Sequence, residues 1–329
     1  MQLLESDAGQ SCGAAGVSRA AFVGRRRLRA PVVCGIVLAG LALVASGAEP
    51  DVAKSQSVVV PMQIARGRVL AAVRINGAAP LSFMLDTGYT LSMINPQHAE
   101  ALQLRRTGEV TIAGIAGDER AGVFGGATFD FAGVSYVPNR LASLPSDRKR
   151  QSRDGILGSG FFRRFVVEID SRAGSLKLHE PGTFAYAGAG EVIALTFRRT
   201  TPIVQAIVRT PGGADAAGGF EIDTGCDGLC MGREFVEAHR LVPDGARGDT
   251  KQGVGGSARV RSGSVPQLRL GKLVIEKPAA DFFLDGSPAG DGLAGHIGME
   301  ILRHYRIIFD YSRQRMILES YPAGDGQKR

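Results

Sequence analysis

The sequence predicts an all-β protein that consists of two similar lobes. The segment 86–104 matches the segment 223–241 without gaps at an offset of 137, and the segment 155–180 matches 295–320 at an offset of 140. Self-similarity over half a chain indicates a duplicated domain, and a period this long suits a pair of lobes and not a solenoid. The 329 residues also include 45 glycines and 15 prolines but no tryptophan, which is typical of many turns between short strands.

Short strands and a few short helices are expected in the same order in both halves. Apolar runs and alternations predict strands at 57–64, 68–75 and 81–85, and again at 191–197, 202–209 and 219–222. The predicted helices are 96–102, which Asn95 caps, and 233–239. The stretch Pro181–Gly190 is rich in Gly and Ala, so it is the expected boundary between the lobes.

The N-terminal segment 1–48 is expected to direct export. Arginines at 25–27 and 29 precede the apolar run 31–45, which ends in Ser46-Gly47-Ala48, as in a secretory signal. The run is short for a membrane span, but an uncleaved inner-membrane anchor stays an alternative to a periplasmic or secreted protein. The predicted domains are a signal peptide or anchor at 1–48, an N-terminal lobe at 49–183, a C-terminal lobe at 184–320 and a tail at 321–329.

Charge gives no indication of a nucleic-acid partner. The whole chain carries a net charge of +7. The segment 1–48 contains five arginines and two acidic residues and so accounts for +3, which leaves +4 for the rest of the chain. The basic cluster at 148–150 with Arg153 is most simply a solvated loop, and no aromatic residues are interleaved with it.

The candidate chemistry lies in the triplet Asp-Thr-Gly, which occurs at 86–88 and again at 223–225. Each copy closes a short apolar strand, so each carboxylate is presented at the end of a buried strand on a turn that contains Gly. Two carboxylates brought close together share one proton, which gives an acid and a base in one site. Asp86 and Asp223 are therefore the candidate catalytic pair. The chain lacks the Gly-x-Ser-x-Gly and His-Glu-x-x-His motifs, which disfavours a serine hydrolase or a zinc peptidase.

A second pair of motifs completes a resemblance to a known family. Ile156-Leu157-Gly158 and Ile297-Gly298 are apolar residues followed by Gly, with His296 at the first apolar place of the second copy. Together with the triplets they resemble the aspartic proteases, in particular retropepsin-like lobes fused in tandem as in pepsin-like enzymes. The resemblance covers most of residues 57–320. It implies two β-barrel lobes related by a pseudo-twofold axis, with a few short helices.

The resemblance also implies a function. Asp86 and Asp223 would meet between the lobes and activate a water molecule that hydrolyses a peptide bond, so the chain is expected to be an aspartic endopeptidase. The loop-supporting residues would be Thr87, Gly88, Thr224 and Gly225. The substrate would be an extended peptide under glycine-rich hairpins near 112–129 and 254–257. A monomer is expected because both lobes lie in one chain, and no cofactor is expected.

Two positions depart from the family pattern. Tyr89 and Cys226 follow the triplets, where the family commonly has Ser, Thr or Ala. A thiol is a weak donor and a tyrosine hydroxyl lies too far from the carboxylate, so we expect the ionised carboxylates to lose a stabilising hydrogen bond. An alternative is therefore a catalytically weak or inactive peptide-binding module on the same fold, with membrane tethering by residues 31–45 as a further possibility.

Metal binding is not expected. Cys226 and Cys230 could form a disulfide in an oxidising compartment, although the short span is geometrically demanding and two buried thiols are the alternative. Two cysteines without further ligands nearby make a poor zinc site. His296, Glu300 and His304 have helical spacing, but His296 falls where a strand is expected, so it is more simply a packed or hydrogen-bonded residue near the active-site loops.

Overall fold

The computed structural model describes residues 57–114, 117–144, 153–253, 256–290 and 292–322. The predicted signal peptide or anchor at 1–48, the basic cluster at 148–150 and most of the predicted tail lie outside these residues. Within the described part, no helix has the length and apolar character that crossing a membrane requires. The domain limits drawn from the sequence stay a prediction.

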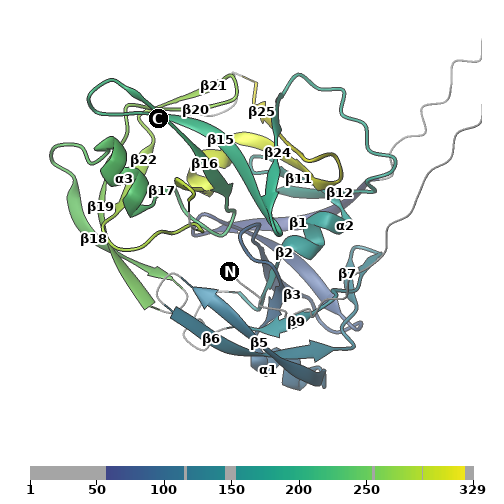
Figure 1. Cartoon of the computed structure of the whole chain (residues 1–329). Helices are drawn as coiled ribbons and strands as arrows, with labels where there is room; N and C mark the ends of the chain where they lie inside the picture. The colour runs from purple at the N-terminus through teal and green to yellow at the C-terminus, as the bar shows by residue number, and fades with distance from the viewer. Residues whose placement is uncertain (1–56, 115–116, 145–152, 254–255, 291, 323–329) are drawn as a thin grey trace, which may run out of the picture. The chain divides into compact units, whose positions relative to one another are not determined.

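The described residues form short strands with a few short helices, so the predicted all-β class is confirmed (Figure 1). The elements of the first half are β1 (Ser57–Ala65), β2 (Arg68–Ile75), β3 (Leu81–Leu85), β4 (Ser92–Ile94), α1 (Pro96–Ala101), β5 (Arg105–Gly114), β6 (Gly117–Gly125), β7 (Phe129–Phe131), β8 (Val134–Tyr136), β9 (Leu141–Ser143), β10 (Gly155–Leu157), α2 (Ser159–Arg164), β11 (Val166–Asp170) and β12 (Ser175–His179).

The second half repeats this order. Its elements are β13 (Glu191–Ala194), β14 (Thr196–Arg198), β15 (Thr201–Arg209), β16 (Asp215–Ile222), β17 (Leu229–Met231), α3 (Arg233–His239), β18 (Arg247–Gly253), β19 (Gly256–Ser264), β20 (Gln267–Leu270), β21 (Leu273–Glu276), β22 (Ala279–Phe283), β23 (Gly295–Ile297), α4 (Met299–Leu302), β24 (Tyr305–Asp310), the 3-10 helix η2 (Tyr311–Arg313) and β25 (Arg315–Ser320).

Local sequence explains where the first helix, α1, begins. The side chain of Asn95 accepts a hydrogen bond of 3.0 Å from the backbone N–H of Gln97, and Pro96 occupies the first helical position of α1. An Asn cap satisfies one of the free N–H groups at a helix start, and Pro has no N–H to leave unpaired there. The predicted helix 96–102 thus begins where expected and ends one residue early.

The second motif of each half lies directly behind a triplet. In the first half β10 runs parallel to β3 and antiparallel to β4, and in the second half β23 runs parallel to β16 and antiparallel to β17. The backbone N–H of Asp86 donates to the carbonyl of Leu157 at 3.0 Å, and that of Asp223 donates to Ile297 at 3.1 Å. Each apolar-Gly motif therefore fixes the backbone of the aspartate in its own half.

One sheet joins the two halves. Strands β1, β12 and β11 of the first half continue into β24, β25 and β13 of the second half, with β11 antiparallel to β24. In that pairing Glu168 lies opposite Ile308, which is its own counterpart in the sequence repeat. A residue can face its repeat equivalent in antiparallel strands only where a local twofold axis passes between them. The predicted pseudo-twofold relation of the lobes follows from this register.

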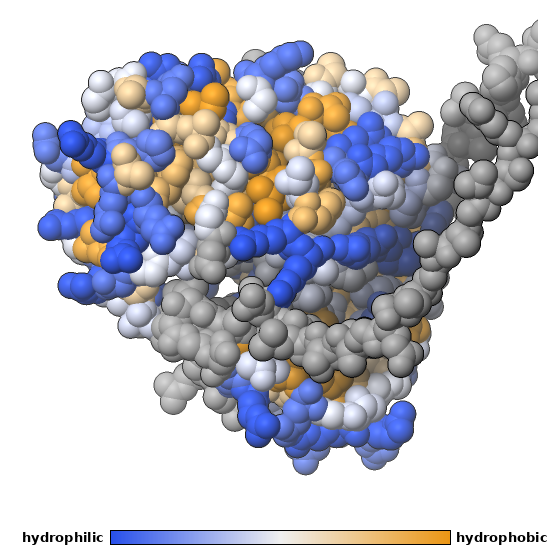
Figure 2. All heavy atoms as spheres, viewed as in Figure 1, coloured by the Kyte–Doolittle hydropathy of each residue, from blue (hydrophilic) through white to orange (hydrophobic). Residues whose placement is uncertain are grey.

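The side-chain core is continuous across this sheet. Phe162 of α2 lies against Phe309 of β24 and stacks on Tyr311, with ring centroids 5.4 and 5.7 Å apart. Apolar contact from both halves is what a stable lobe interface requires. The space-filling view shows polar and apolar side chains intermixed on the outer face, as is usual for a folded domain (Figure 2).

Two hairpins lie in corresponding places in the halves. The first consists of β5 and β6, in which Arg105 pairs with Gly125, so it starts earlier than the predicted 112–129. The prediction was wrong at its C-terminal end because Phe129 begins β7, which pairs with β2 instead. The second hairpin consists of β18 and β19. The turns at 115–116 and 254–255 lie outside the described residues.

Candidate active site

The two Asp-Thr-Gly loops are joined by four hydrogen bonds that involve both threonines. The Thr87 N–H donates to the Thr224 hydroxyl at 3.1 Å, and the Thr224 N–H donates to the Thr87 hydroxyl at 3.0 Å. The Thr87 hydroxyl donates to the carbonyl of Ile222 at 2.6 Å, and the Thr224 hydroxyl donates to Leu85 at 2.9 Å. Both threonines are fully buried. This network holds the ends of β3 and β16 together.

The two carboxylates face each other across this junction. A Cβ added to Gly88 would lie 2.9 Å from Cγ of Asp223, and one added to Gly225 would overlap the carboxylate of Asp86. Each aspartate thus lies against the glycine of the opposite triplet, where any other residue would collide with it. Each also accepts a hydrogen bond within its own loop, from the Gly88 N–H to Asp86 at 3.0 Å and from the Gly225 N–H to Asp223 at 2.8 Å.

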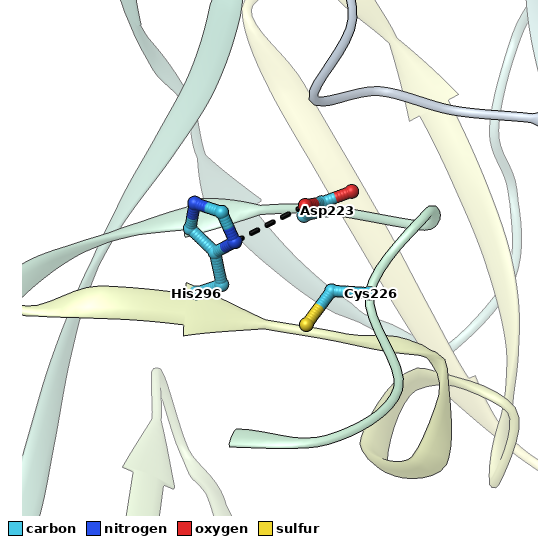
Figure 3. Close-up of side chains that lie close together, drawn as sticks. All are labelled: Asp223, Cys226 and His296. Atoms are coloured by element: carbon cyan, nitrogen blue, oxygen red, sulfur yellow. Dashed lines mark ion pairs between the residues drawn. The ribbon is translucent and has the colours of Figure 1, made fainter. Parts of the chain in front are cut away.

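A histidine, His296, lies beside the carboxylate of Asp223, whereas the corresponding position of the first lobe is Ile156. Nδ1 of His296 lies 3.1 Å from Oδ2 of Asp223 (Figure 3). Nε2 of the same ring lies 2.8 Å from Oε2 of Glu221. All three side chains are between 11% and 14% exposed. His296 therefore bridges two acidic groups in a nearly dry environment.

Electrostatics at Asp223 differ from the expectation. Burial alone raises its pKa, but His296, the Gly225 N–H and the side chain of Asp86 outweigh burial and lower the pKa below its usual range. We expected the ionised form to lose stabilisation because Cys226 replaces a hydroxyl donor. The loss of that donor stays a prediction, but the expectation did not include His296, which comes close to the carboxylate from β23 and favours its ionised form.

The polar set around His296 replaces an apolar set in the first lobe. In β16 and β23 Glu221 pairs with His296, and in β17 Cys230 also pairs with it. At the matching offsets of the repeat, the corresponding strands of the first lobe pair apolar residues. The second-lobe residues are Glu221, Cys230 and His296, and their first-lobe counterparts are Met84, Met93 and Ile156.

Sequence reasoning singled out His296 but missed Glu221 as its partner. The repeat itself could have revealed the pair. At the offsets of 137 and 140 that align the two halves, Glu221 and His296 stand where the first half has apolar residues. The strand position of His296 was predicted correctly. The alternative metal face through Glu300 and His304 is not formed as one helix face, since His296 lies in β23 and Glu300 in α4.

The two cysteines of the described chain are free thiols with their Sγ atoms 3.5 Å apart. The hydrogen bond to Cys230 and burial both raise the pKa of Cys226 well above its usual value. Their pairing in an oxidising compartment stays a prediction.

Folding also surrounds Cys226 with ligand types that spacing alone did not reveal. One ligand atom each from Asp223, Cys226 and His296 lies within 4.8 Å of the others, so this set could hold a metal ion. Along the sequence, Cys230 is the only other cysteine or histidine close to Cys226, which is why a zinc site was not expected. His296 lies far beyond Cys226 in the sequence, and only the fold brings the two residues together.

Fold and site together define a two-lobed protein with one Asp-Thr-Gly loop from each lobe at the junction. A family model described as aspartyl protease matches the chain twice, at residues 71–161 and 209–301, which together are more than half of it. The chain therefore belongs to the aspartyl protease family, in its tandem two-lobe form. Each match includes one triplet and one apolar-Gly motif. The comparison with curated proteins gave no match.

Proposed function

We propose that the protein is an aspartic endopeptidase whose water nucleophile is activated between Asp86 and Asp223. Family membership supports a peptide-hydrolysing role. The observation that carries the proposal is that each carboxylate lies against the glycine of the opposite triplet, with Asp86 buried and the side chain of Asp223 14% exposed. The threonine hydrogen bonds fix this arrangement.

The proposed reaction needs one proton between two carboxylates. The ionised carboxylate acts as general base on the water, and the protonated one polarises the scissile carbonyl and later helps to protonate the leaving amine. Water attacks the carbonyl carbon directly, so no covalent enzyme intermediate forms. Because the carboxylates are coupled, the pair titrates as a unit.

The proposed substrate is an extended peptide or protein segment bound between the lobes. Such a segment would bond along its backbone like an added strand. The hairpins β5–β6 and β18–β19 occupy corresponding places in the halves and are proposed to close over it. We further propose that the protein acts as a monomer after export. The basic and apolar pattern at 25–45 supports export, with an uncleaved anchor as the alternative.

A second candidate function is a peptide-binding module that has lost turnover. One observation favours it: the carboxylate of Asp223 already forms an ion pair with His296. The two functions differ in a simple way, since a binding module would retain peptides without cleaving them.

The decisive experiment is cleavage of a mixed peptide library by the full chain, compared with Asp86→Asn and Asp223→Asn. Each variant should lose about 10²–10⁴-fold in rate, the usual contribution of a general acid or base. Asp244→Asn, at an exposed position outside the loops, is the matched control and should cleave normally. Cleavage that survives either dyad substitution would reject the mechanism. Peptide binding without cleavage by the unaltered chain would favour the second function.

A further inference from the structure

We propose that Asp223, Cys226 and His296 form a binding site for one zinc ion, and that zinc bound there inhibits the enzyme. The binding part of this inference is independent of the reaction, whereas the inhibitory part rests on the proposed function. Three observations support zinc binding. They are the distances between the ligand atoms, the position of Glu221 beside His296, and the presence of polar residues where the first lobe has apolar ones.

The ligand atoms have separations suited to one small cation. Zn–N and Zn–O bonds are about 2.0–2.2 Å, so two such ligands on a tetrahedral zinc lie about 3.3 Å apart. Nδ1 of His296 and Oδ2 of Asp223 are 3.1 Å apart. The sulfur of Cys226 completes a set in which all ligand atoms lie within 4.8 Å of one another. Figure 3 shows the three side chains converging from β23 and from the loop after β16.

The carboxylate of Glu221 lies next to the ring nitrogen of His296 that faces away from Asp223. A ligating histidine usually donates its other ring N–H to a carboxylate, which fixes the ring and its tautomer. Nε2 of His296 lies 2.8 Å from Glu221, so Nδ1 is the nitrogen directed at Asp223 and Cys226. The outer carboxylate is therefore close to the ring as an ion-pair partner, and a small rotation of either side chain would be needed to align the hydrogen bond that Nε2 does not make in this structure.

The first lobe shows that the fold does not need these polar residues. Its strands pair Met84 with Ile156 where the second lobe pairs Glu221 with His296. Burying polar and charged groups costs free energy unless each one is paired, so an apolar set is the less costly way to fill the site. A ligand-binding role accounts for the polar set, whereas packing does not.

The ligand types favour zinc. Sulfur and imidazole ligands favour zinc over magnesium or calcium, and a coordinated thiol gives up its proton. Cys230 is buried, with its Sγ atom 3.5 Å from that of Cys226, but it is not among the ligand atoms that lie within 4.8 Å of one another. The protein therefore supplies three ligands, which leaves the fourth position of a tetrahedral zinc for water.

Zinc at this site would occupy Oδ2 of Asp223. That carboxylate could then neither accept a proton from the nucleophilic water nor share one with Asp86. Turnover should fall as zinc is added and return when a chelator removes it. Zinc availability would thus regulate the proposed protease.

The test is zinc binding to the full chain, kept reduced with a phosphine and first cleared of metal. Calorimetric titration with Zn²⁺ should give one site, and Co²⁺ should give the absorption band of a cobalt–thiolate bond. Cys226→Ser and His296→Gln should each weaken binding by 100-fold or more. Glu221→Gln should weaken it about 10–100-fold, the usual effect of an outer-shell partner. His98→Gln is the control, because His98 pairs with Asp154 in the first lobe.

Several results would overturn the inference. It fails if the unaltered chain binds no zinc at micromolar concentration, or if binding survives both Cys226→Ser and His296→Gln. Thermal unfolding without zinc shows whether each variant is folded, and zinc should raise the melting temperature of the unaltered chain but not of folded Cys226→Ser.

The two proposals can fail separately. A chain that binds zinc but cleaves no peptide would refute the protease function and keep the metal site. A chain that cleaves peptides but binds no zinc would refute the metal site and keep the protease function. A chain that binds zinc and cleaves peptides equally well with and without it would refute only the inhibition.

Discussion

Replacing Glu168 should make the stability of the protein much less sensitive to acid. Glu168 lies at the centre of the sheet that joins the lobes, and its side chain is only 8% exposed. Nζ of Lys177 lies 2.9 Å from one carboxylate oxygen, and Nε2 of His179 lies 3.0 Å from the other. Arg306 adds a third basic group at 3.7 Å. Burial alone raises the pKa of Glu168, but His179 and Lys177 outweigh it and lower the pKa from 4.5 to about 2.

The sign and size of the effect follow from this shift. A carboxyl whose pKa is lower in the folded state stabilises the fold fully above its unfolded pKa of 4.5, and it loses that contribution as the pH falls toward about 2. Each pKa unit corresponds to about 1.4 kcal/mol, so the carboxylate contributes about 3 kcal/mol near neutral pH. Glu168→Gln removes this contribution and leaves Lys177 and His179 without their acidic partner.

Urea unfolding at a series of pH values measures the effect. The free energy of unfolding of Glu168→Gln should lie about 3 kcal/mol below that of the unaltered chain above about pH 5, and the difference should nearly vanish at about pH 2. Glu180→Gln is the control, because Glu180 pairs with Arg164 at the surface and such pairs contribute about 1 kcal/mol or less. A difference that stays constant over the whole pH range would refute the reasoning.

Three further substitutions test the site. Thr87→Ala should destabilise the protein by about 1–3 kcal/mol in urea unfolding, because it leaves a buried N–H of the opposite loop without its acceptor. Gly225→Ala should yield a folded protein that cleaves peptides poorly, because the new Cβ collides with the carboxylate of Asp86. Replacing Glu221 with Met and His296 with Ile together should change the unfolding free energy little or raise it by about 1–4 kcal/mol, whereas changing His296 alone should cost about 3–5 kcal/mol.

Each of these has its own control. Thr87→Ser keeps the hydroxyl and should behave almost like the unaltered chain. Gly182→Ala adds a Cβ in open space and should leave cleavage intact. For the double variant with Met at 221 and Ile at 296, the control is the single variant His296→Ile. If the double variant is no more stable than the single one, an unpaired Glu221 is not the reason that His296→Ile lowers the unfolding free energy.

Much of the fold was readable from the sequence because the chain contains it twice. The first offset located both triplets and both following helices, and the second located both apolar-Gly motifs. Strands β1 to β3 begin at the predicted residues, since their apolar patterns are bounded by turn residues. The first hairpin was placed several residues too late because glycines mark flexible positions along the whole stretch and do not fix a pairing register.

The candidate site was readable only in part. Asp86 and Asp223 stood out because they repeat, whereas Glu221 and His296 form a contact between strands that are distant in sequence and have no motif of their own. Such a contact depends on the register of β16 against β23, in which Glu221 lies opposite His296. A single residue of slip would turn both side chains to the other face of the sheet. Local patterns cannot specify that pairing.

The same register also explains why the two halves of a symmetric fold need not be chemically equivalent. The backbone around the two aspartates is nearly identical, down to the carbonyl that receives each aspartate N–H. Yet one carboxylate has apolar residues at the positions behind it, and the other has a histidine held by a second acid. The backbone hydrogen bonds do not involve these side chains, so the paired strand positions can differ between the lobes while the backbone stays the same. The two-lobed chain can therefore place a regulatory ligand site on one carboxylate, which a symmetric pair of identical lobes could not do for one alone.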